Sequence, residues 1–570
     1  MKRFFTRFLP AAFLSFTALF FSSMEVYLRN IAEFTFPATH VWKIMLLLTL
    51  VFPLFYAFLS GFLPYKAEQT VSSVFTAVGL ALYIQGMFLN GHLQELNGEN
   101  TVFSSRTISG NAFLWLILLC VFLFLFFMIR RKAGHEKLTE ILMLTCAGLI
   151  LIQGAGLFST AVSVSPEDSE KDFYLSTDRE FELSSEKNVL FFILDNCDSF
   201  IVNDALKEDP ALFDELDGFT YYPNMTSEYS RTYPAVPYLL TGEKCYFDKP
   251  YTQYIQDAYE SSTFLDEMHD SGTDIRIYTA LNYLSSEEYS MVDNVSSYDS
   301  DSLSVISAKD LIKAMIRLGS YRSMPYFLKG FFSYTIDPIN RNVLSGMPEN
   351  YFTLTNNDFD YHIRLGTKGI TSTDDYRSAF RFYHLFGPHP GCYMNEYGGF
   401  DRNATQSQAL RGDIRMLREF FEGMKQNGTY DCSTIIITAD HGNQNESEDF
   451  LLHNPACCIL LVKPSGNSEE PFSVSNAPVC HNDLFAVVKS GLGLPLAEGE
   501  IPVWDIPENT DRERYYYHTA QVSATDGEVA LREYRVTGDA TDFSGWELTG
   551  NDRDIVYSAN SVSKRRLSTD

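Results

Sequence analysis

The stretch Asn188-Val-Leu-Phe-Phe-Ile-Leu-Asp-Asn196 decides the fold of the larger part of the chain. It begins with a continuous apolar run of strand length, in which polar and apolar residues do not alternate. A strand of this kind is usually covered on both faces, as in a parallel sheet. The run ends directly in Asp195, so the sequence predicts a carboxylate at the carboxyl end of a buried strand.

Similar apolar runs recur downstream, at residues 274–278, 380–383, 433–438 and 457–462. Helical patterns lie between them, and the clearest repeats apolar residues at steps of three and four from Leu410 to Met424 before Asn427-Gly428. Strands that alternate with helices predict an α/β domain with a mainly parallel central sheet. The tail from Arg512 to Trp546 is patterned differently, and it predicts antiparallel strands added at an edge.

Five apolar stretches precede this domain, at residues 8–21, 41–63, 71–89, 112–129 and 138–158. They approach or reach the length of about 20 residues that a bilayer requires. The first could be a signal peptide, since basic residues precede it. No small-residue cleavage site stands out and four spans follow, which favours a five-helix transmembrane bundle.

Basic residues predict how this bundle is oriented. They gather before the first stretch, after the second and after the fourth: Lys2, Arg3, Arg7, Lys66, Arg130, Arg131, Lys132 and Lys137. All three segments fall on one side of a five-span bundle, which should be the cytoplasm. The chain after about Thr160 should therefore lie outside the cytoplasm of a multi-pass cell-membrane protein. The spans hold almost no ionisable residues, so we expect an anchor that could bind lipid rather than a transporter.

These patterns give four predicted regions. Residues 1–160 form the transmembrane domain with five helices, 161–187 an acidic linker, 188–510 the α/β domain and 511–570 its antiparallel extension. The net charge of -28 belongs to the polar part, which argues against nucleic acid as a partner. It does not exclude a phosphate-bearing substrate, because a bound metal can invert the local field. The nine cysteines show no regular spacing, so a full disulfide framework is not expected, although one or two bridges remain open.

Candidate metal ligands follow two of the predicted strands. Asp195 follows the first, and Asp440-His441-Gly442 follows the run that ends at Thr438. In open α/β sheets, sites form beyond the carboxyl ends of the strands, and carboxylates with a histidine suit a divalent cation. Each residue alone could instead be a cap or turn residue.

A candidate nucleophile lies in Ser230-Arg-Thr-Tyr-Pro-Ala-Val-Pro-Tyr-Leu-Leu-Thr-Gly242. Pro234 suits the first turn of a helix, which puts Thr232 at or just before the helix N-terminus, where an anion is favoured. A metal-activated hydroxyl there could attack phosphorus, although a plain N-cap would explain Thr232 alone. His384, His389 and His453 could bind substrate oxygens, protonate a leaving group or ligate a second metal. His481 starts a helical pattern and is interpreted as structural.

Taken in order, these elements resemble the alkaline phosphatase and sulfatase superfamily. Within it they are similar to the membrane phosphotransferases, the lipoteichoic acid synthases and lipid A phosphoethanolamine transferases. The resemblance rests on Asp195 after the first strand, on Thr232-x-Pro-x-x-Pro running to Leu-Leu-Thr-Gly, and on Asp440-His-Gly with a Leu-His twelve residues after His441. The spacing from His384 to His389 also matches the phosphoethanolamine transferases.

The resemblance implies one divalent metal, Zn²⁺ or Mn²⁺, held by Asp195, Thr232, Asp440 and His441. It implies Thr232 as the nucleophile that forms a phospho-threonine. The remaining candidates, His384, His389 and His453, would line the phosphate and leaving-group side.

Two departures from the family patterns bear on the chemistry. Sulfatases carry Cys or Ser in Cys/Ser-x-Pro-x-Arg, whereas here Thr232 cannot become the aldehyde and Val236 replaces the arginine. This counts against sulfatase chemistry. The phosphotransferases often have Glu where this chain has Asp195.

The leading hypothesis is a membrane-anchored phosphotransferase. It would move a phospholipid head group, phosphoglycerol or phosphoethanolamine, to a cell-surface glycan or polymer. The first alternative is a sulfatase-family phosphodiesterase or other ester hydrolase that uses water as acceptor, and the second is a non-catalytic anchored binding protein.

Overall fold

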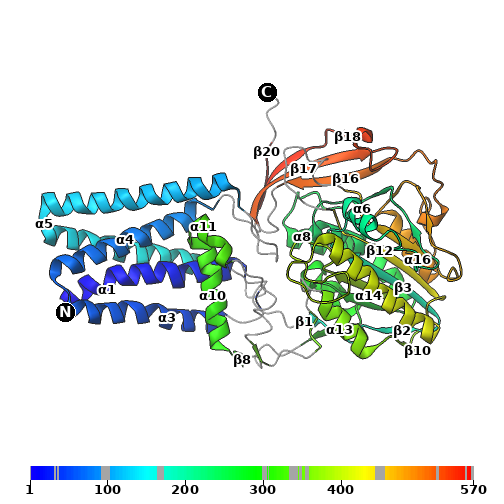
Figure 1. Cartoon of the computed structure of the whole chain (residues 1–570), viewed down its shortest axis with the longest axis horizontal. Coiled ribbons are helices and arrows are strands. Elements are labelled where there is room, and N and C mark those ends of the chain that lie inside the picture. The colour runs from blue at the N-terminus through cyan, green and yellow to red at the C-terminus, as the bar shows by residue number, and fades with distance from the viewer. Residues whose placement is uncertain are drawn as a thin grey trace. The chain divides into compact units, whose positions relative to one another are not determined.

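The computed structural model of the chain describes residues 2–30, 34, 38–90, 103–163, 173–297, 304–305, 307–332, 344–345, 350–352, 358–442, 456–520, 526–558 and 561–565. It divides into two compact units (Figure 1). The helical unit comprises Met1–Asp172 and Tyr298–Pro348, and the sheet unit comprises Phe173–Ser297 and Glu349–Asp570. Each is described by itself below.

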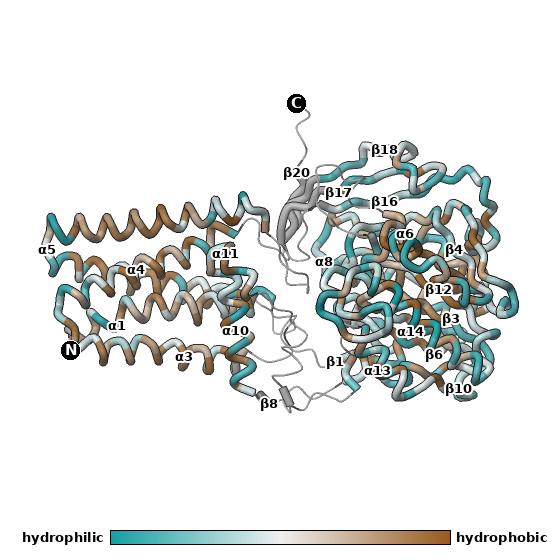
Figure 2. The backbone as a smooth tube through the Cα atoms, viewed as in Figure 1, coloured by the Kyte–Doolittle hydropathy of each residue, from teal (hydrophilic) through white to brown (hydrophobic). Residues whose placement is uncertain are grey.

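Apolar helices make up most of the helical unit (Figure 2). Its first helical run consists of α1 (Lys2–Ser15), the π-helical turn η1 (Phe16–Phe21) and α2 (Ser22–Arg29). It is followed by α3 (Ala38–Leu59), η3 (Ser60–Phe62), α4 (Tyr65–Phe88) and α5 (Ser105–Ser163). Within the described residues, four helical segments are long and apolar enough to cross a membrane: Phe4–Arg29, Val41–Phe62, Tyr65–Phe88 and Ser105–Ser163.

The predicted count of five spans differs from this count of four because of helix α5. A straight helix of its 59 residues would measure about 90 Å, roughly three times the hydrocarbon thickness of a bilayer. Gly134 interrupts it with φ 86° and ψ 172°, which is not a helical conformation. The fourth and fifth predicted spans lie on either side of this glycine, so one assigned helix contains both.

The predicted basic segments lie at one end of the helical unit. Arg7 in α1 forms an ion pair with Glu68 at the start of α4, with Nε and Oε2 3.1 Å apart. Gln69 donates from Nε2 to the carbonyl of His135, next to the break at Gly134, over 2.7 Å. The first turns of α1 and α4 and the interruption of α5 therefore meet at one end of the bundle.

Three short helices from the middle of the chain lie at the opposite end of the helical unit. They are α10 (Ala308–Ser323), α11 (Tyr326–Lys329) and η8 (Gly330–Phe332). Ser23 donates to the carbonyl of Met315 over 2.8 Å, and Asn90 donates to the carbonyl of Arg322 over 3.0 Å. The sequence analysis placed these residues inside the region 188–510, but their contacts assign them to the helical unit. The paired strands β8 (Ser304–Val305) and β9 (Leu344–Ser345) flank them.

The sheet unit is built on a seven-stranded sheet in the order β14-β4-β13-β12-β3-β11-β6. Its parallel centre contains the predicted strands: β3 (Lys187–Leu194), β6 (Thr273–Tyr278), β11 (Ser378–Leu385) and β12 (Ser433–Thr438). Beyond β12 lie β13 (Leu460–Lys463), β4 (Thr220–Tyr221) and β14 (Ser473–Val474), and β13 runs antiparallel to β12. The α/β fold with a mainly parallel sheet is thus confirmed.

Helices cover both faces of this sheet. Phe420 and Phe421 of α14 (Gln406–Asn427) pack their rings against Phe192 of β3. Gly491 of α16 (Asp483–Leu492) approaches Val189, three positions earlier in β3 and therefore on the other face. The remaining helices of the sheet unit are α6 (Ser199–Glu208), α7 (Thr232–Thr241), α8 (Tyr251–Ser261), α9 (Phe264–Asp270), α13 (Asp358–Lys368), η5 (Leu281–Tyr283), η6 (Ser286–Ser290), η9 (Val503–Asp505) and η10 (Phe543–Gly545).

The C-terminal strands form a sheet of their own, which corrects the expectation that they extend an edge of the central sheet. They are β16 (Arg514–Ala520), β17 (Asp526–Val536), β18 (Trp546–Leu548), β19 (Arg553–Ser558) and β20 (Ser561–Arg565), paired antiparallel throughout. Strand β16 attaches to the segment that precedes Thr232. Tyr517 donates its N–H to the carbonyl of Glu228 over 2.8 Å, and the hydroxyls of Ser230 and Thr519 are 3.0 Å apart.

The predicted linker 161–187 is folded over much of its length. Its first residues complete α5, and further on β1 (Phe173–Leu175) pairs with β7 (Val295–Ser297). Strand β2 (Glu182–Ser184) pairs with β10 (Thr371–Thr373), and elsewhere β5 (Met225–Thr226) pairs with β15 (Val479–Cys480). All nine cysteines carry free thiols, so neither of the bridges left open by the sequence forms.

Candidate active site

Four neighbouring parallel strands end at the same edge of the sheet and carry the site. Asp195 follows β3, Asp440 and His441 follow β12, and Thr279 follows β6, whereas His384 is the second-to-last residue of β11. The register places Ile193 opposite both His384 and Thr438, so these strand ends are level. The sheet thus brings together side chains that are far apart in the sequence.

A hydrogen bond from the turn after β3 links the strand ends that carry Asp195 and Asp440. Asn196 has φ 63°, a left-handed conformation that asparagine tolerates better than most residues. In this conformation its backbone N–H donates to Oδ1 of Asp440 over 3.2 Å. The two strand ends that carry Asp195 and Asp440 are therefore linked by a hydrogen bond as well as by the sheet.

His441 lies at the centre of the cluster. Its Nδ1 lies 2.7 Å from the carbonyl oxygen of Gly442, which can only accept, so Nδ1 carries the proton and Nε2 presents a lone pair. That Nε2 lies 3.6 Å from Oδ1 of Asp195, 3.4 Å from Oδ2 of Asp440 and 3.1 Å from Oγ1 of Thr232. All four predicted ligand residues thus face one point.

Thr232 is the first residue of α7 and does not cap it. Arg231, with extended backbone dihedrals, occupies the N-cap position, and no side chain caps this helix terminus. The Thr232 hydroxyl instead faces Nε2 of His441, which lies 3.1 Å from Oγ1. The N-cap interpretation that the sequence left open is therefore not what the structure shows.

The protonation states of the cluster suit a cation. Burial acts to raise the pKa of Asp440, but His441, His384 and the Thr232 hydroxyl outweigh it and hold that pKa below its ordinary value. Burial lowers the pKa of His441, and Asp440 offsets this only in part. An ionised carboxylate and a neutral imidazole are the forms that bind metal ions.

The donor set fits a divalent cation. Ligand atoms of Asp195, Asp440 and His441 all lie within 4.8 Å of one another and are buried. Among the residues that the structure describes, Oδ2 of Asp440 and Nε2 of His384 are buried and have no hydrogen-bond partner. A buried carboxylate oxygen without a donor is destabilising unless a cation compensates it. Two carboxylates with one imidazole are a set that Zn²⁺ and Mn²⁺ both accept.

His384 lies beside the cluster of Asp195, Asp440 and His441. Its Nε2 is 3.6 Å from Oδ2 of Asp195, and its Nδ1 is 2.8 Å from the hydroxyl of Thr279. Burial lowers the pKa of His384 to about 4, so the ring is neutral at pH 7. Thr279 was missed by the sequence analysis, although it directly follows a predicted strand, which was the only signal that could have revealed it.

His389 is also buried and neutral. Its Nδ1 lies 3.0 Å from the carbonyl oxygen of Pro390, and burial together with nearby His441 lowers its pKa to about 4. The third predicted histidine, His453, lies outside the described residues. His481 bridges two backbone groups, with Nε2 2.9 Å from the carbonyl of Ala439 and Nδ1 accepting from the N–H of Glu228 over 3.2 Å, which agrees with a structural role.

A buried carboxylate pair supports the turn between His384 and His389, and the sequence analysis missed it. Asp358 accepts from the N–H of Phe386 over 2.9 Å and from the N–H of Gly387 over 2.6 Å. Burial raises the pKa of Asp358 to about 6, and burial beside Asp358 raises the pKa of Asp413 well above its usual range. Burial beside Asp358 therefore favours the protonated form of Asp413.

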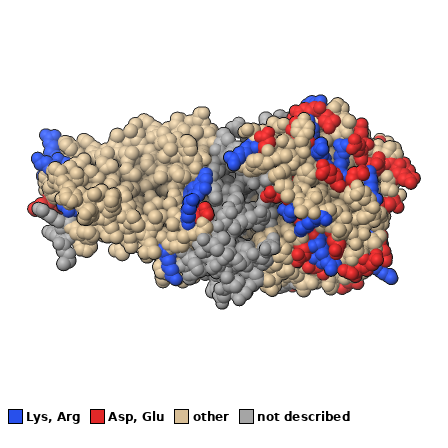
Figure 3. All heavy atoms as spheres, turned by 60° about the horizontal axis from the view of Figure 1, so that its bottom comes forward, with Lys and Arg blue, Asp and Glu red and all other residues tan. Residues whose placement is uncertain are grey.

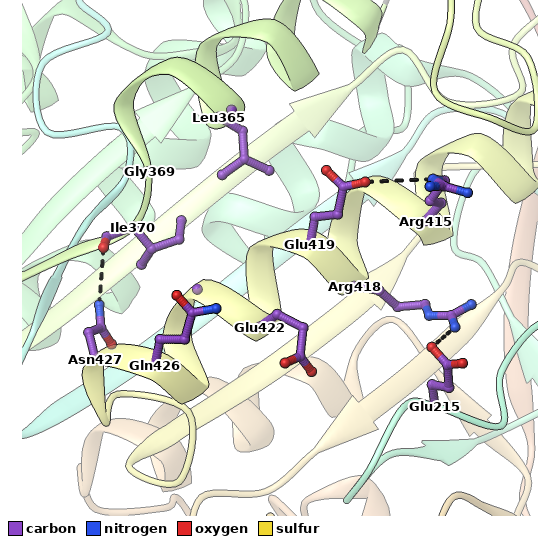
Figure 4. Close-up of a pocket in the computed structure, with 12 residues that line it drawn as sticks. Glu215, Leu365, Gly369, Ile370, Arg415, Arg418, Glu419, Glu422, Gln426 and Asn427 are labelled. Carbon is purple, nitrogen blue, oxygen red and sulfur yellow. Dashed lines mark hydrogen bonds and ion pairs between the residues drawn. The ribbon is translucent and has the colours of Figure 1, made fainter.

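A hollow of about 790 Å³ lies elsewhere on the sheet unit, between α13 and α14 (Figure 4). None of its lining residues belongs to the site above. Its charged residues all have ion-pair partners: Arg418 contacts Glu215, Arg415 lies 3.6 Å from Glu419, and Glu422 lies 3.0 Å from Lys425 of the same helix. This hollow therefore shows no unbalanced charge that would call for a ligand.

No family model matches the sequence, and no curated protein matches it. Several solved structures are similar. Ps i-CgsB is 11% identical with a TM-score of 0.40, covering 64% of this chain and 86% of that chain. A protein in the alkaline phosphatase superfamily from Vibrio parahaemolyticus is 13% identical with a TM-score of 0.33, covering 70% and 85%. The C-terminal periplasmic domain of EcEptC from Escherichia coli is 10% identical with a TM-score of 0.33, covering 60% and 92%. Similarity at this level transfers no activity, and the site assignment rests on the geometry of this chain.

Proposed function

We propose that the protein is a membrane-anchored, metal-dependent phosphotransferase. It takes the head group of a phospholipid, phosphoglycerol or phosphoethanolamine, onto Thr232 and passes it to a hydroxyl of a cell-surface glycan or polymer. The observation that carries the proposal is the 3.1 Å approach of Oγ1 of Thr232 to Nε2 of His441, the same nitrogen that faces both carboxylates. A hydroxyl at this point lies at a helix N-terminus and beside a cation site, which suits attack on a phosphate.

The first half-reaction forms a phospho-threonine. A divalent cation, Zn²⁺ or Mn²⁺, held by Asp195, Asp440 and His441 would lower the pKa of the Thr232 hydroxyl and balance the charge of the phosphate. Oγ1 of Thr232 attacks phosphorus and loses its proton, for which the Asp440 carboxylate is within hydrogen-bonding reach. The bond from phosphorus to the glyceride oxygen breaks, and diacylglycerol leaves with the proton that Asp440 took from Thr232.

The second half-reaction regenerates the threonine. An acceptor hydroxyl attacks the same phosphorus, the bond from phosphorus to Oγ1 breaks, and Thr232 regains a proton. His384 and His389, with pKa values lowered to about 4 by burial, are neutral at pH 7. A neutral imidazole can take the proton of the incoming hydroxyl but has no second proton to give, so these histidines suit the base role better than leaving-group protonation.

The test uses the full chain in vesicles with a donor phospholipid radiolabelled in its head group. Rapid acid quenching should trap label on a peptide containing Thr232, and added acceptor glycan should remove it with transfer to the glycan. Thr241→Ala is the matched control, because Thr241 lies in the same helix and bonds the carbonyl of Pro237 over 2.8 Å, away from the site. If the label is released only as free head group even when glycan is present, the reaction is hydrolysis and not transfer. Failure to label Thr232 under any condition would refute the covalent mechanism.

A further inference from the structure

Asp358, the first residue of α13, is a carboxylate buried inside the sheet unit. Figure 3 shows many acidic and basic side chains on the surface of this unit, whereas Asp358 is only 7% exposed. Carboxylates are rarely buried unless hydrogen-bond donors hold them, because burial removes the water that would otherwise bind their oxygens. The donors around Asp358 therefore indicate what this side chain does.

Both oxygens of Asp358 bind the turn that follows β11. Oδ1 accepts from the N–H of Phe386 over 2.9 Å, and Oδ2 accepts from the N–H of Gly387 over 2.6 Å. Because two consecutive peptide groups donate to different oxygens of one carboxylate, neither group can rotate without losing its bond. A side-chain amide in the same place would offer one acceptor and would turn its own N–H₂ towards the second N–H.

Asp413 of α14 lies beside this carboxylate. It is fully buried, and neither of its oxygens has a hydrogen-bond donor among the residues that the structure describes. Burial beside Asp358 raises the pKa of Asp413 well above its usual range, which favours the protonated form. A protonated Asp413 can donate to Asp358, so the surroundings of Asp358 suit an ionised carboxylate that only accepts.

The turn that Asp358 holds also carries His389. The N–H of His389 donates to the carbonyl of Phe386 over 3.3 Å, so the backbone of the histidine is bonded to a residue that Asp358 fixes. Nδ1 of His389 lies 3.0 Å from the carbonyl oxygen of Pro390, which can only accept. Nδ1 therefore carries the proton, and Nε2 presents the lone pair that a base requires.

The other candidate groups at this edge of the sheet depend less on the turn. His384 lies within β11, which pairs with β3 and β6, and its Nδ1 is 2.8 Å from the hydroxyl of Thr279. Asp195 directly follows β3, which has a strand on both sides. His389 lies beyond the end of β11 at Leu385 and belongs to no strand. A loosened turn should therefore displace His389 first.

We propose that Asp358 is a positioning residue for the step that removes the phosphoryl group from Thr232. By holding the N–H groups of Phe386 and Gly387, it keeps His389 where the imidazole can take the proton of the incoming hydroxyl. It acts through the backbone and not on the substrate. The inference rests on the proposed function, and it predicts an effect on the second half-reaction with little effect on the first.

The test follows label on Thr232 of the full chain in vesicles. The donors are phosphatidylglycerol and phosphatidylethanolamine, each radiolabelled in the head group, and the acceptor is water or glycan extracted from the cell envelope. Asp358→Asn should label Thr232 within about twofold of the wild-type rate. It should lose that label about 10-fold or more slowly, which is part of the roughly 10²–10⁴-fold that a general base contributes.

Asp360→Asn is the matched control. Asp360 lies in the same helix and is not among the described residues that bind this turn, so the same chemical change there should alter neither rate. His389→Gln should slow the loss of label more than Asp358→Asn does. Adding Asp358→Asn to His389→Gln should slow it no further, because a positioning residue has no effect once the residue that it positions is gone.

Equal slowing of both half-reactions by Asp358→Asn would overturn the proposal, and so would additive slowing in the double variant. If Asp358→Asn does not fold, Asp358→Ser removes the carboxylate without opposing two N–H groups, and the same outcomes apply to it. A wild-type protein that never carries label on Thr232 would contradict the proposed function itself. A labelled wild type with an unaffected Asp358→Asn variant would contradict only the positioning role.

Discussion

The hydroxyl of Thr232 has no role in capping α7, so its loss should affect chemistry more than folding. Thr232→Ala should lower the rate of head-group release by roughly 10³-fold or more, a typical loss for a nucleophile. Thr232→Ser should retain part of the rate, since the attacking oxygen remains. Initial rates with labelled lipid, compared with bound metal measured by mass spectrometry, check this. An alanine variant with normal turnover would remove Thr232 from the mechanism.

Among the candidate ligands, Asp440 is the one whose replacement should lower metal affinity most. Its Oδ1 accepts from Asn196, whereas its buried Oδ2 has no hydrogen-bond donor and faces His441. Asp440→Asn should keep the first bond but weaken metal affinity by about 100-fold or more, since it removes a negative charge from the site. Equilibrium dialysis with Zn²⁺ and Mn²⁺ measures the change. Equal affinity in wild type and variant would contradict the ligand assignment.

The Asp358–Asp413 pair should make the sheet unit less stable as pH rises. Both carboxyl groups have pKa values raised in the folded state, chiefly by burial, so the folded state binds protons more tightly than the unfolded state. The stability that this pair contributes is then fully present below about pH 4 and is lost as pH rises through the folded pKa values. Asp413→Asn removes one titration and donates an amide N–H to Asp358. It should stabilise the protein by about 1 kcal/mol or more at pH 8, and less at pH 5.

Melting temperatures at the two pH values check this prediction. Asp270→Asn, whose side chain is 86% exposed, is the matched control and should change neither value. A destabilised Asp413→Asn protein at pH 8 would show that the pair does not share a proton.

At the scale of elements, the sequence predicted the strands that matter for the site. The runs that became β3 and β12 are apolar throughout because helices cover both faces, and this pattern is visible without a structure. The run at 457–462 was less informative. Strand β13 begins only at Leu460, because Cys457 and Cys458 pair with the turn around Asp198 instead. Such pairing depends on a partner far away in the sequence, which periodicity cannot reveal.

The turn after β11 offers a test of how tightly the site is packed. Gly387 has φ 59°, and a Cβ there would lie 2.8 Å from the backbone nitrogen of Asp195. Gly387→Ala should therefore destabilise the protein and displace Asp195, lowering metal affinity. Gly369→Ala is the matched control, since Gly369 has φ 67° but no atom within 4 Å of a Cβ.

The control variant should show only the backbone strain of about 1–3 kcal/mol. The difference in melting temperature and metal affinity between the two variants isolates the contact with Asp195. If the two variants show equal changes, the turn at Gly387 accommodates the added methyl group without displacing Asp195.

At the scale of the whole molecule, topology follows from the ends of the helical unit. Helix α5 ends, and residues 308–332 lie, at the end of the helical unit opposite the Arg7–Glu68 pair and the break at Gly134, so the chain leaves the helical unit from that end. If the basic end is cytoplasmic, the sheet unit lies outside. A phosphatase reporter active only outside the cytoplasm, fused after Asp570, should be active. Activity of a reporter restricted to the cytoplasm would reverse the orientation.

The sequence predicted two main parts but not how the chain is shared between them. Helix α10 has an amphipathic pattern with charged residues such as Lys309 and Lys313, which is typical of a helix on a soluble domain. Its apolar face packs on helix ends, for example at Leu318, instead of on the sheet. The independent C-terminal sheet was missed for a similar reason, because alternation predicts antiparallel strands but not the sheet to which they belong.

The number of times the chain passes between the two units determines how easily proteolysis could release the sheet unit. The chain passes between the two units at three places, after Ser163, after Ser297 and after Phe332. A surface protease that cuts once, between Ser163 and Phe173, would leave the sheet unit attached to the helical unit through the segment of α10, α11 and η8, residues 308–332. Release would need two further cuts, one on each side of that segment. A protein with one ordinary linker is released by a single cut, whereas three cuts are needed to release the sheet unit of this chain.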